Sequence, residues 1–307
     1  MARGRAHANH HQLTKARVDT IHTIDWMKQV ARAARSEGRL VGFVPTMGAL
    51  HEGHLSLVRA AQQQCAPVVV SIFVNPAQFG PNEDLSKYPR QMERDRAMLE
   101  EAGVDYLFAP GADEIYPNGF RTFVEVQGLS DRYEGKSRPG HFRGVATVVL
   151  KLLEIVQPHF AYFGRKDAQQ ARVIRQMAAD LNHDTEVVTC PIVREADGLA
   201  MSSRNAYLSD EQRRAATVLY RALGVARHEI LAGTRDAASL VRAMRDVLAK
   251  EPLAQPDYVE IVDADTLEPV VLLRRACMVL MAVRVGATRL LDNMLVEEAG
   301  GKFDASL

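Results

Sequence analysis

Two histidines stand close together in the segment PTMGALHEGH, which covers residues 45–54. They are His51 and His54, with Gly53 between them. An apolar, β-prone run over residues 39–44 precedes the segment and a helical pattern follows it, so a strand should end and a helix begin here. Side chains at i and i+3 on a helix face the same side, and the unpaired N–H groups of a helix start attract anions. The pattern indicates a phosphate site, and hence a nucleotide.

Other interpretations of the pair are open. Histidine pairs also bind zinc, and single histidines often pack or face solvent without a function. A zinc pair on a helix usually has i, i+4 spacing and a third ligand, and neither is evident near His51 and His54. A nucleotide site is the favoured interpretation.

A second polar segment, FVNPAQFG at residues 73–80, follows a predicted strand. Asn75 and Gln78 offer neutral donors and acceptors that suit the hydroxyl and carboxylate groups of a small polar substrate. A plain polar turn around Pro76 and Gly80 explains the same residues.

A third segment, GRKDAQQ at residues 164–170, also joins a predicted strand to a helix. Gly164 permits close approach of the backbone, Lys166 supplies a positive charge for phosphate, and Asp167 could accept from ribose hydroxyls. Asp167 could equally be a helix N-cap.

Two predicted loops carry side chains that are suited to covering a bound anion. Residues 197–205 carry Ser202, Ser203 and Arg204, which would contact phosphates from a mobile loop. Residues 132–143 (RYEGKSRPGHFR) are locally basic, and they form either a solvated loop or a lid over an anionic ligand.

Other nucleotide motifs are missing. The Gly-Lys-Ser at 135–137 is not a P-loop, because a P-loop needs Gly where position 130 is Ser. A G-x-G-x-x-G motif does not follow the first long strand, so a dinucleotide oxidoreductase is disfavoured.

The composition is that of an ordinary globular protein. Of the 307 residues 47% are hydrophobic and 25% charged, and 38 basic residues balance 38 acidic ones, so no net field favours nucleic acid or membrane surfaces. The three cysteines, Cys65, Cys190 and Cys277, are expected to be reduced and buried. No signal peptide or membrane-spanning run is expected, and the predicted location is the cytoplasm.

The order of predicted elements indicates an α/β fold. Predicted strands at 39–45, 67–73, 104–109, 159–163 and 185–190 alternate with predicted helices at 23–37, 54–65, 90–102, 144–156 and 167–182. Such alternation predicts a Rossmann-like, doubly wound parallel sheet, in which ligands bind beyond the carboxyl ends of strands where the winding reverses. Residues 47–54, 75–79 and 164–170 should therefore converge.

The order of predicted helices and strands changes near residue 193. Predicted helices at 210–232 and 235–250 precede predicted strands at 257–263, 277–284 and 287–293. We expect a disordered, basic tail over 1–18, a Rossmann-like domain that binds the nucleotide and substrate over 19–192, and a smaller α+β domain over 193–307 that closes over the nucleotide site.

Taken together, the segments PTMGALHEGH, FVNPAQFG, RPGHFRGV, FGRKDAQQ and VREADGLAMSSRN strongly resemble the pantothenate synthetase (pantoate–β-alanine ligase) family. The family belongs to a nucleotidyltransferase superfamily that shares the HIGH-type fold with class I aminoacyl-tRNA synthetases. The resemblance, over about residues 20–295, implies ATP-dependent condensation of pantoate with β-alanine. The resemblance implies a pantoyl adenylate intermediate and the release of pyrophosphate and AMP.

The resemblance also implies roles for single residues. His54, His51 and Lys166 would be catalytic. Pantoate would bind Gln78 and Gln170, with Gln78 also near β-alanine, and Mg²⁺ would contact Asp95, although Arg94 stands where some relatives carry an acidic residue. The ATP site would comprise Met47, Gly48, Ala49, Leu50, His51, Glu52, Gly53, His54, Gly164, Arg165, Lys166, Asp167, Val193, Met201, Ser202, Ser203 and Arg204. A homodimer formed through the N-terminal domain is implied as well.

Two rival functions are distinguishable. A small-molecule nucleotidyltransferase of the same superfamily would transfer the nucleotide to a phosphate and would lack the pair of glutamines. A catalytically silent nucleotide-binding module would not need the paired histidines.

Overall fold

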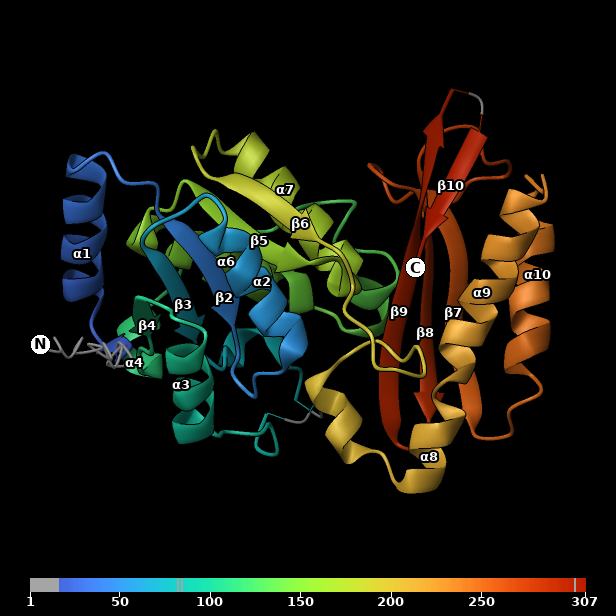
Figure 1. Cartoon of the computed structure of the whole chain (residues 1–307), viewed down its shortest axis with the longest axis horizontal. Coiled ribbons are helices and arrows are strands. Elements are labelled where there is room, and N and C mark those ends of the chain that lie inside the picture. The colour runs from blue at the N-terminus through green and yellow to red at the C-terminus, as the bar shows by residue number, and fades with distance from the viewer. Residues whose placement is uncertain (1–16, 82, 84, 301) are drawn as a thin grey trace, which may run out of the picture.

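The computed structural model describes residues 17–307 except residues 82, 84 and 301. A six-stranded sheet lies in the N-terminal half and a four-stranded sheet in the C-terminal half (Figure 1). The strands of the first sheet, in spatial order, are β1 (Asp19–Ile21), β4 (Tyr106–Phe108), β3 (Val68–Ile72), β2 (Gly42–Thr46), β5 (Phe160–Gly164) and β6 (Glu186–Cys190). All neighbouring strands are parallel, which confirms the predicted Rossmann-like sheet.

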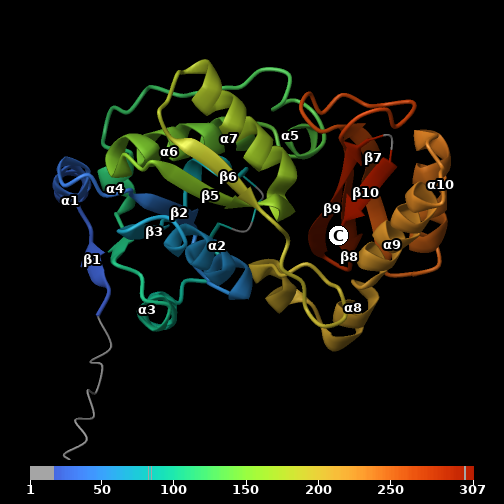
Figure 2. The same ribbon diagram turned by 45° about the horizontal axis from the view of Figure 1, so that its top comes forward.

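Helices cover both faces of this sheet (Figure 2). One face packs against α1 (Ile24–Ser36), α6 (His141–Val156) and α7 (Ala168–Asp180), and the other packs against α2 (Glu52–Gln62) and α3 (Met92–Glu101). Successive residues of β2 alternate between the two cores, with Phe43 in the first and Val44 in the second. A sheet buried on both faces needs continuously apolar strands, which explains the apolar runs of the sequence.

The winding of the sheet reverses between β2 and β5. From β2 the chain proceeds outward through β3 and β4, and it then returns to the other side of β2 to form β5 and β6. The carboxyl ends of β2 and β5 are therefore neighbours, and the crevice above them is where open α/β sheets bind ligands.

The C-terminal sheet is antiparallel. Its strands, in spatial order, are β10 (Lys302–Ser306), β9 (Thr288–Ala299), β8 (Cys277–Val285) and β7 (Ala254–Asp263). Helices α9 (Val218–Leu231) and α10 (Ala237–Leu248) pack on one face. The opposite face contributes Val262 and Leu280 to the core of the N-terminal half, so the two halves share apolar contacts.

Several elements differ from the prediction. The helix predicted at 210–232 is two helices, α8 (Asp210–Ala215) and α9, and the irregular stretch of the first half holds the short helices α4 (Ala112–Ile115) and α5 (Glu134–Ser137). Strands β1 and β10 were not predicted, because runs of three to five residues are too short to show periodicity. Three 3₁₀ helices also occur, η1 (Pro76–Gln78), η2 (Arg165–Asp167) and η3 (Ser203–Tyr207).

Most of the predicted tail, residues 1–16, lies outside the described residues. Val18 contradicts the tail prediction, because it is only 2% exposed and packs in the core beneath α2. The three cysteines are buried and free, as predicted.

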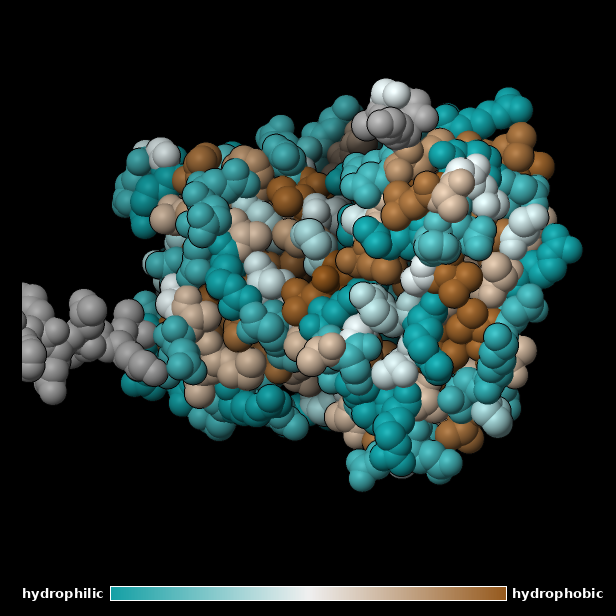
Figure 3. All heavy atoms as spheres, turned by 45° about the vertical axis from the view of Figure 1, so that its right-hand side comes forward, coloured by the Kyte–Doolittle hydropathy of each residue, from teal (hydrophilic) through white to brown (hydrophobic). Residues whose placement is uncertain are grey.

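The surface is mainly hydrophilic on the face shown in Figure 3, with apolar residues exposed in scattered groups, several of them in the recessed middle of the molecule. Within residues 17–307, leaving aside the three gaps, none of the helices has the length and hydrophobicity to cross a membrane.

Candidate active site

A cavity of about 210 Å³ lies beyond the carboxyl ends of β2 and β5, where the winding reverses. A larger cavity of about 570 Å³ adjoins it on the side of the C-terminal sheet. The residues that line both cavities are Met47, Gln78, Lys166, Asp167, Gln170 and Arg204. The predicted segments after β2, β3 and β5 therefore do converge, and residues 191–193 and 201–204 join them.

The two histidines form a capping box at the start of α2. His51 is the N-cap, and its Nδ1 accepts from the Gly53 N–H at 3.1 Å, while the Nδ1 of His54 accepts from the His51 N–H at 3.3 Å. The ring centroids are 4.1 Å apart. A Cβ on Gly53 would lie 2.8 Å from Cε1 of His51, so this position must be glycine for the ring to fold over the helix start.

The histidine pair is neutral at physiological pH. Burial and, to a smaller extent, the positive charge of Lys166 lower the pKa of His51 to about 4. Burial also lowers the pKa of His54 to about 3, and a charge on His51 acts in the same direction. Because both Nδ1 atoms accept backbone N–H groups, the hydrogen-bond network assigns the proton of each ring to Nε2. The pair therefore presents two Nε2–H donors rather than two positive charges.

We expect the free energy of unfolding to decrease as the pH falls from the ordinary pKa of histidine to the lowered pKa values of His51 and His54. An unfolded histidine binds a proton below its ordinary pKa of about 6.5, whereas His51 and His54 stay neutral in the folded chain down to about pH 4. Within this window the unfolded state holds more protons, so the free energy of unfolding decreases as pH falls, by about 1.4 kcal/mol per pH unit for each histidine. Urea midpoints between pH 7 and pH 4.5 measure the slope. It should be shallower for His54→Gln, and equal slopes for the two proteins would contradict the assignment.

Asp95, the residue expected to contact Mg²⁺, lies in α3 and binds the backbone of the loop before α2. Its side chain is 1% exposed, its Oδ2 accepts from the Ala49 N–H at 2.8 Å, and its Oδ1 accepts from the Leu50 N–H at 2.9 Å. Asp95 is not among the residues that line either cavity. The carboxylate stabilises an unusual backbone conformation of this loop, in which Gly48 and Ala49 both have positive φ, at 80° and 51°.

Gln78 lies where η1 packs tightly on α6. Asn75 donates from Nδ2 to Oε1 of Gln78 at 3.0 Å and to the Gly144 carbonyl at 3.1 Å. A Cβ on Gly144 would lie 2.2 Å from the carbonyl oxygen of Ala77, so only glycine allows this approach. The Gln78 amide nitrogen donates to the sulfur of Met47 at 3.2 Å, a weak partner that a polar ligand could replace.

The two adjacent glutamines of α7 have different surroundings. Gln169 is 4% exposed and donates to the carbonyls of Leu129 and Arg132, both at 2.8 Å. Gln170 lines both cavities, and its side chain has no hydrogen bond with any described residue. The predicted pantoate residue is therefore the one that can receive a ligand.

Lys166 and Asp167 face both cavities as an ion pair, with Lys166 Nζ 3.2 Å from Oδ1 of Asp167. Burial raises the pKa of Asp167, but Lys166 and Arg204 outweigh this effect, and the pKa of the carboxyl stays below its usual value. From the second sheet, Asn293 donates to the carbonyls of Arg165 and Lys166 at 2.8 and 2.9 Å. The Asp167 side chain makes no cap hydrogen bond, which disfavours the simple N-cap alternative.

Residues 193–205 fold back on themselves beside the smaller cavity. The Met201 N–H donates to the Val193 carbonyl at 3.0 Å, and Ser202 caps η3. Arg194 forms a buried ion pair with Asp292 at 2.8 Å, which anchors the segment to β9. The predicted phosphate-contacting residues thus reach the cavity from a segment that is tied to the C-terminal sheet.

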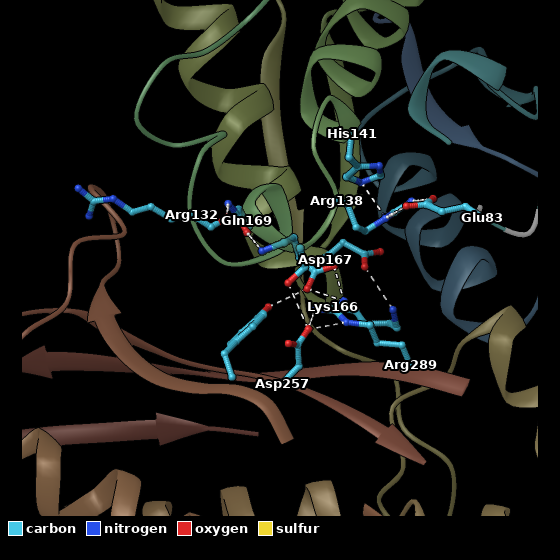
Figure 4. A network of polar contacts seen from close by, with 12 residues as sticks. Glu83, Arg132, Arg138, His141, Lys166, Asp167, Gln169, Asp257 and Arg289 are labelled. Atoms are coloured by element: carbon cyan, nitrogen blue, oxygen red, sulfur yellow. Dashed lines mark hydrogen bonds and ion pairs between the residues drawn. The ribbon is translucent and has the colours of Figure 1, made fainter. Parts of the chain in front are cut away.

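A polar network joins the two halves beneath the larger cavity (Figure 4). Glu134 of α5, only 6% exposed, receives Arg289 of β9 at 2.7 Å and the hydroxyl of Tyr258 at 3.0 Å. Arg289 also pairs with Asp257 at 2.8 Å. This network fixes α5, and with it the start of the segment that was predicted to be a solvated loop or a lid.

Comparison with known proteins assigns the chain to a family. The family described as pantoate-beta-alanine ligase matches residues 19–295. The pantothenate synthetase of Caldicellulosiruptor bescii is 55% identical over 277 residues, which make up 90% of this chain and 98% of that protein. The chain belongs to the pantoate–β-alanine ligase family.

Solved structures agree with this assignment. Pantothenate synthetase from Thermus thermophilus superimposes with a TM-score of 0.86 at 49% identity, covering 90% of this chain and 98% of that one. A pantoate–β-alanine ligase from Francisella tularensis, complexed with beta-gamma ATP and β-alanine, superimposes with a TM-score of 0.73 at 35% identity, covering 91% and 97%. The predicted fold class and the predicted ligase activity are confirmed.

Several residues around the cavities of this ligase could not be identified from the sequence next to them. Asn293 and Arg289 lie on β9, more than a hundred residues from the segments they hold, and Tyr88 lies in a loop between β3 and α3. Only the fold brings them together. Arg138 and His141 stand inside the quoted RPGHFRGV motif, whose function the spacing did not reveal.

Proposed function

We propose that the smaller cavity binds ATP and pantoate and forms pantoyl adenylate, and that β-alanine reaches this intermediate from the larger cavity. The observation that carries this proposal is the neutral pair of Nε2–H donors, His51 and His54, in one cavity with Lys166 and the two glutamines.

The chemistry requires activation of a carboxylate. An oxygen of pantoate bonds to the α-phosphorus of ATP while the bond from that phosphorus to pyrophosphate breaks. The amine of β-alanine then attacks the carbonyl carbon, and the electron pair of the broken C–O bond leaves with AMP. Charge builds on phosphate oxygens in the first step, and fixed donors stabilise it without reorganisation. We assign this function to His54, secondarily to His51, and to Lys166.

Nucleotide binding is assigned to the three segments around the smaller cavity. Residues 47–54 would line the triphosphate, and residues 164–167 would hold ribose and phosphate. The Val193 N–H would donate to adenine, since its carbonyl already accepts from Met201. Met201, Ser202, Ser203 and Arg204 would cover the phosphates and help to exclude water, which would otherwise hydrolyse the adenylate.

Magnesium is proposed to enter with the nucleotide. The described residues hold no group of three or more His, Cys, Asp or Glu side chains placed to bind a metal ion, and Mg²⁺ commonly binds through substrate phosphates and only one or two carboxylates. Asp167 is the carboxylate that lines the smaller cavity, so we propose it, and not Asp95, as the nearest protein group.

The function is tested by coupled pyrophosphate release. Purified protein should release pyrophosphate from MgATP only when pantoate is present, and AMP should be released with pantothenate once β-alanine is added. Pyrophosphate release without pantoate, or none with all three substrates, would contradict the proposal.

Replacing Gln170 with alanine should raise the KM for pantoate much more than the KM for ATP. The substitution removes a neutral hydrogen-bonding side chain from the boundary of the two cavities, and such a bond contributes about 0.5–1.5 kcal/mol, or up to tenfold in affinity. Initial rates with each substrate varied in turn measure both constants. An equal rise in both would show that Gln170 does not contact pantoate.

We also propose the division into residues 19–192 and 193–307, a homodimer formed through the N-terminal half, and a cytoplasmic location. The resemblance to the family supports the dimer. Light scattering of the purified chain gives its native mass.

A further inference from the structure

Arg138 lies in the larger cavity with its guanidinium bound to a carboxylate of the chain itself (Figure 4). Its Nε donates to Oε1 of Glu83 at 2.8 Å, and its second terminal nitrogen donates to Oε2 at 2.5 Å. These two parallel bonds are the geometry with which arginine binds carboxylates. We propose that Arg138 binds the carboxylate of β-alanine, and that Glu83 competes for the same position. The inference rests on the proposed function.

The surroundings of Arg138 hold it in place. The Arg138 guanidinium donates to Nε2 of His141 at 3.1 Å, so His141 carries its proton on Nδ1 and donates to the Gln78 carbonyl at 2.9 Å. Arg138 also donates to the same carbonyl at 3.4 Å. The guanidinium is thereby fixed against the backbone of Gln78, whose side chain is assigned to pantoate.

Arg138 lines the larger cavity together with Gln78, which also lines the smaller one. Three bonds separate the carboxylate carbon of β-alanine from its amine nitrogen. A β-alanine whose carboxylate is bound to Arg138 could therefore direct its amine toward Gln78 and the boundary between the cavities, where we propose that the carbonyl of pantoyl adenylate lies. Ligands without a carboxylate would lose the contact with Arg138.

Two of the other cations that line the larger cavity already have anionic partners from rigid elements. Arg289 is held by Glu134 and Asp257, and Lys166 by Asp167. Glu83 differs, because it comes from the loop between η1 and α3 and not from a helix or strand. Burial raises the pKa of Glu83, but Arg138 outweighs this and holds the pKa below its usual value, so Glu83 is an ionised competitor at neutral pH.

Only one of the arginines in the basic segment 132–143 serves this purpose. Arg132 pairs with Glu268 at 3.2 Å, and the exposed Arg143 lies over the ring of Phe123 at 3.9 Å. Arg138 lines the larger cavity. The segment is thus more than a solvated loop, and it contributes one anchoring charge to the larger cavity.

The test separates the two half-reactions. Arg138→Ala and Arg138→Lys should leave pantoate-dependent ATP–pyrophosphate exchange within about twofold of wild type, while the KM for β-alanine rises about 10- to 100-fold, as expected for loss of hydrogen bonds to a charged group. Arg143→Ala, in the same motif, should change neither. Thermal unfolding of each variant checks the fold, and Arg138→Lys supplies the answer if Arg138→Ala does not fold.

A substrate analogue and a second variant sharpen the result. Wild-type enzyme should prefer β-alanine to β-alaninamide, which lacks the carboxylate, and Arg138→Lys should lose at least tenfold of this preference. Glu83→Gln should lower the KM for β-alanine, because the competing charge is gone. An equal loss of both half-reactions, an unchanged preference, or a higher KM in Glu83→Gln would overturn the inference. Failure of wild-type enzyme to exchange pyrophosphate would instead overturn the proposed function.

Discussion

Replacing His54 with alanine is expected to slow the formation of pantoyl adenylate by about 10²–10³-fold, the usual cost of losing one preorganised donor to a transition state. The neutral Nε2–H of His54 is the donor in question. Single-turnover pyrophosphate release with saturating pantoate and MgATP measures the chemical step directly. Near-native adenylate formation by the variant would remove His54 from the mechanism.

The substitution also removes half of a capping box, so a control must separate stability from chemistry. His54 accepts from the N-cap N–H, and loss of a capping interaction costs about 0.5–2 kcal/mol. Glutamine is an ordinary residue at this position of a capping box. His54→Gln should therefore restore the urea midpoint while adenylate formation remains at least about tenfold slow. If His54→Gln restored the rate together with the stability, His54 would be structural only.

Replacing Lys166 with methionine is expected to have an effect of similar size, about 10²–10³-fold on adenylate formation. The substitution removes one of the two positive charges that line both cavities, and it leaves Asp167 without its ion-pair partner 3.2 Å away. The unpaired carboxylate would then repel the triphosphate. The KM for ATP should rise together with the fall in rate.

The double variant Lys166→Met/Asp167→Asn distinguishes these two effects. Removal of the carboxylate should restore part of the ATP affinity and little of the rate, because the missing charge still fails to stabilise the transition state. A double-mutant cycle gives the coupling between the two residues. Strictly additive effects on ATP affinity would show that the pair does not act together on the nucleotide.

The first sheet was predictable because its strands are apolar throughout and alternate with long helices. Runs such as PVVVSIF before Asn75 identify buried parallel strands, and they place the loops that follow at one edge of the sheet. Strand β1, in contrast, is three residues long and pairs only with β4. Its position depends on tertiary contacts that leave no periodicity in the sequence.

The site was predictable where a short motif contains all its parts. His51, Gly53 and His54 act within one helix turn, so spacing alone indicated their arrangement, but their neutral state depends on burial that the sequence does not reveal. The surroundings of Asp95 were hidden for a similar reason. A carboxylate in the first turn of a helix suits a metal or a backbone loop equally well, and only the fold shows two loop N–H groups against it.

The amide of Asn293 has a consequence for the whole molecule. It spans the two halves by holding the backbone carbonyls of Arg165 and Lys166 from β9. A nucleotide that stabilises this turn therefore stabilises the C-terminal sheet through linkage, since any ligand that binds only the native state raises the free energy of unfolding of everything that melts with its site. The Asn293 amide is thus one of the contacts through which substrate occupancy can raise the cooperativity of unfolding.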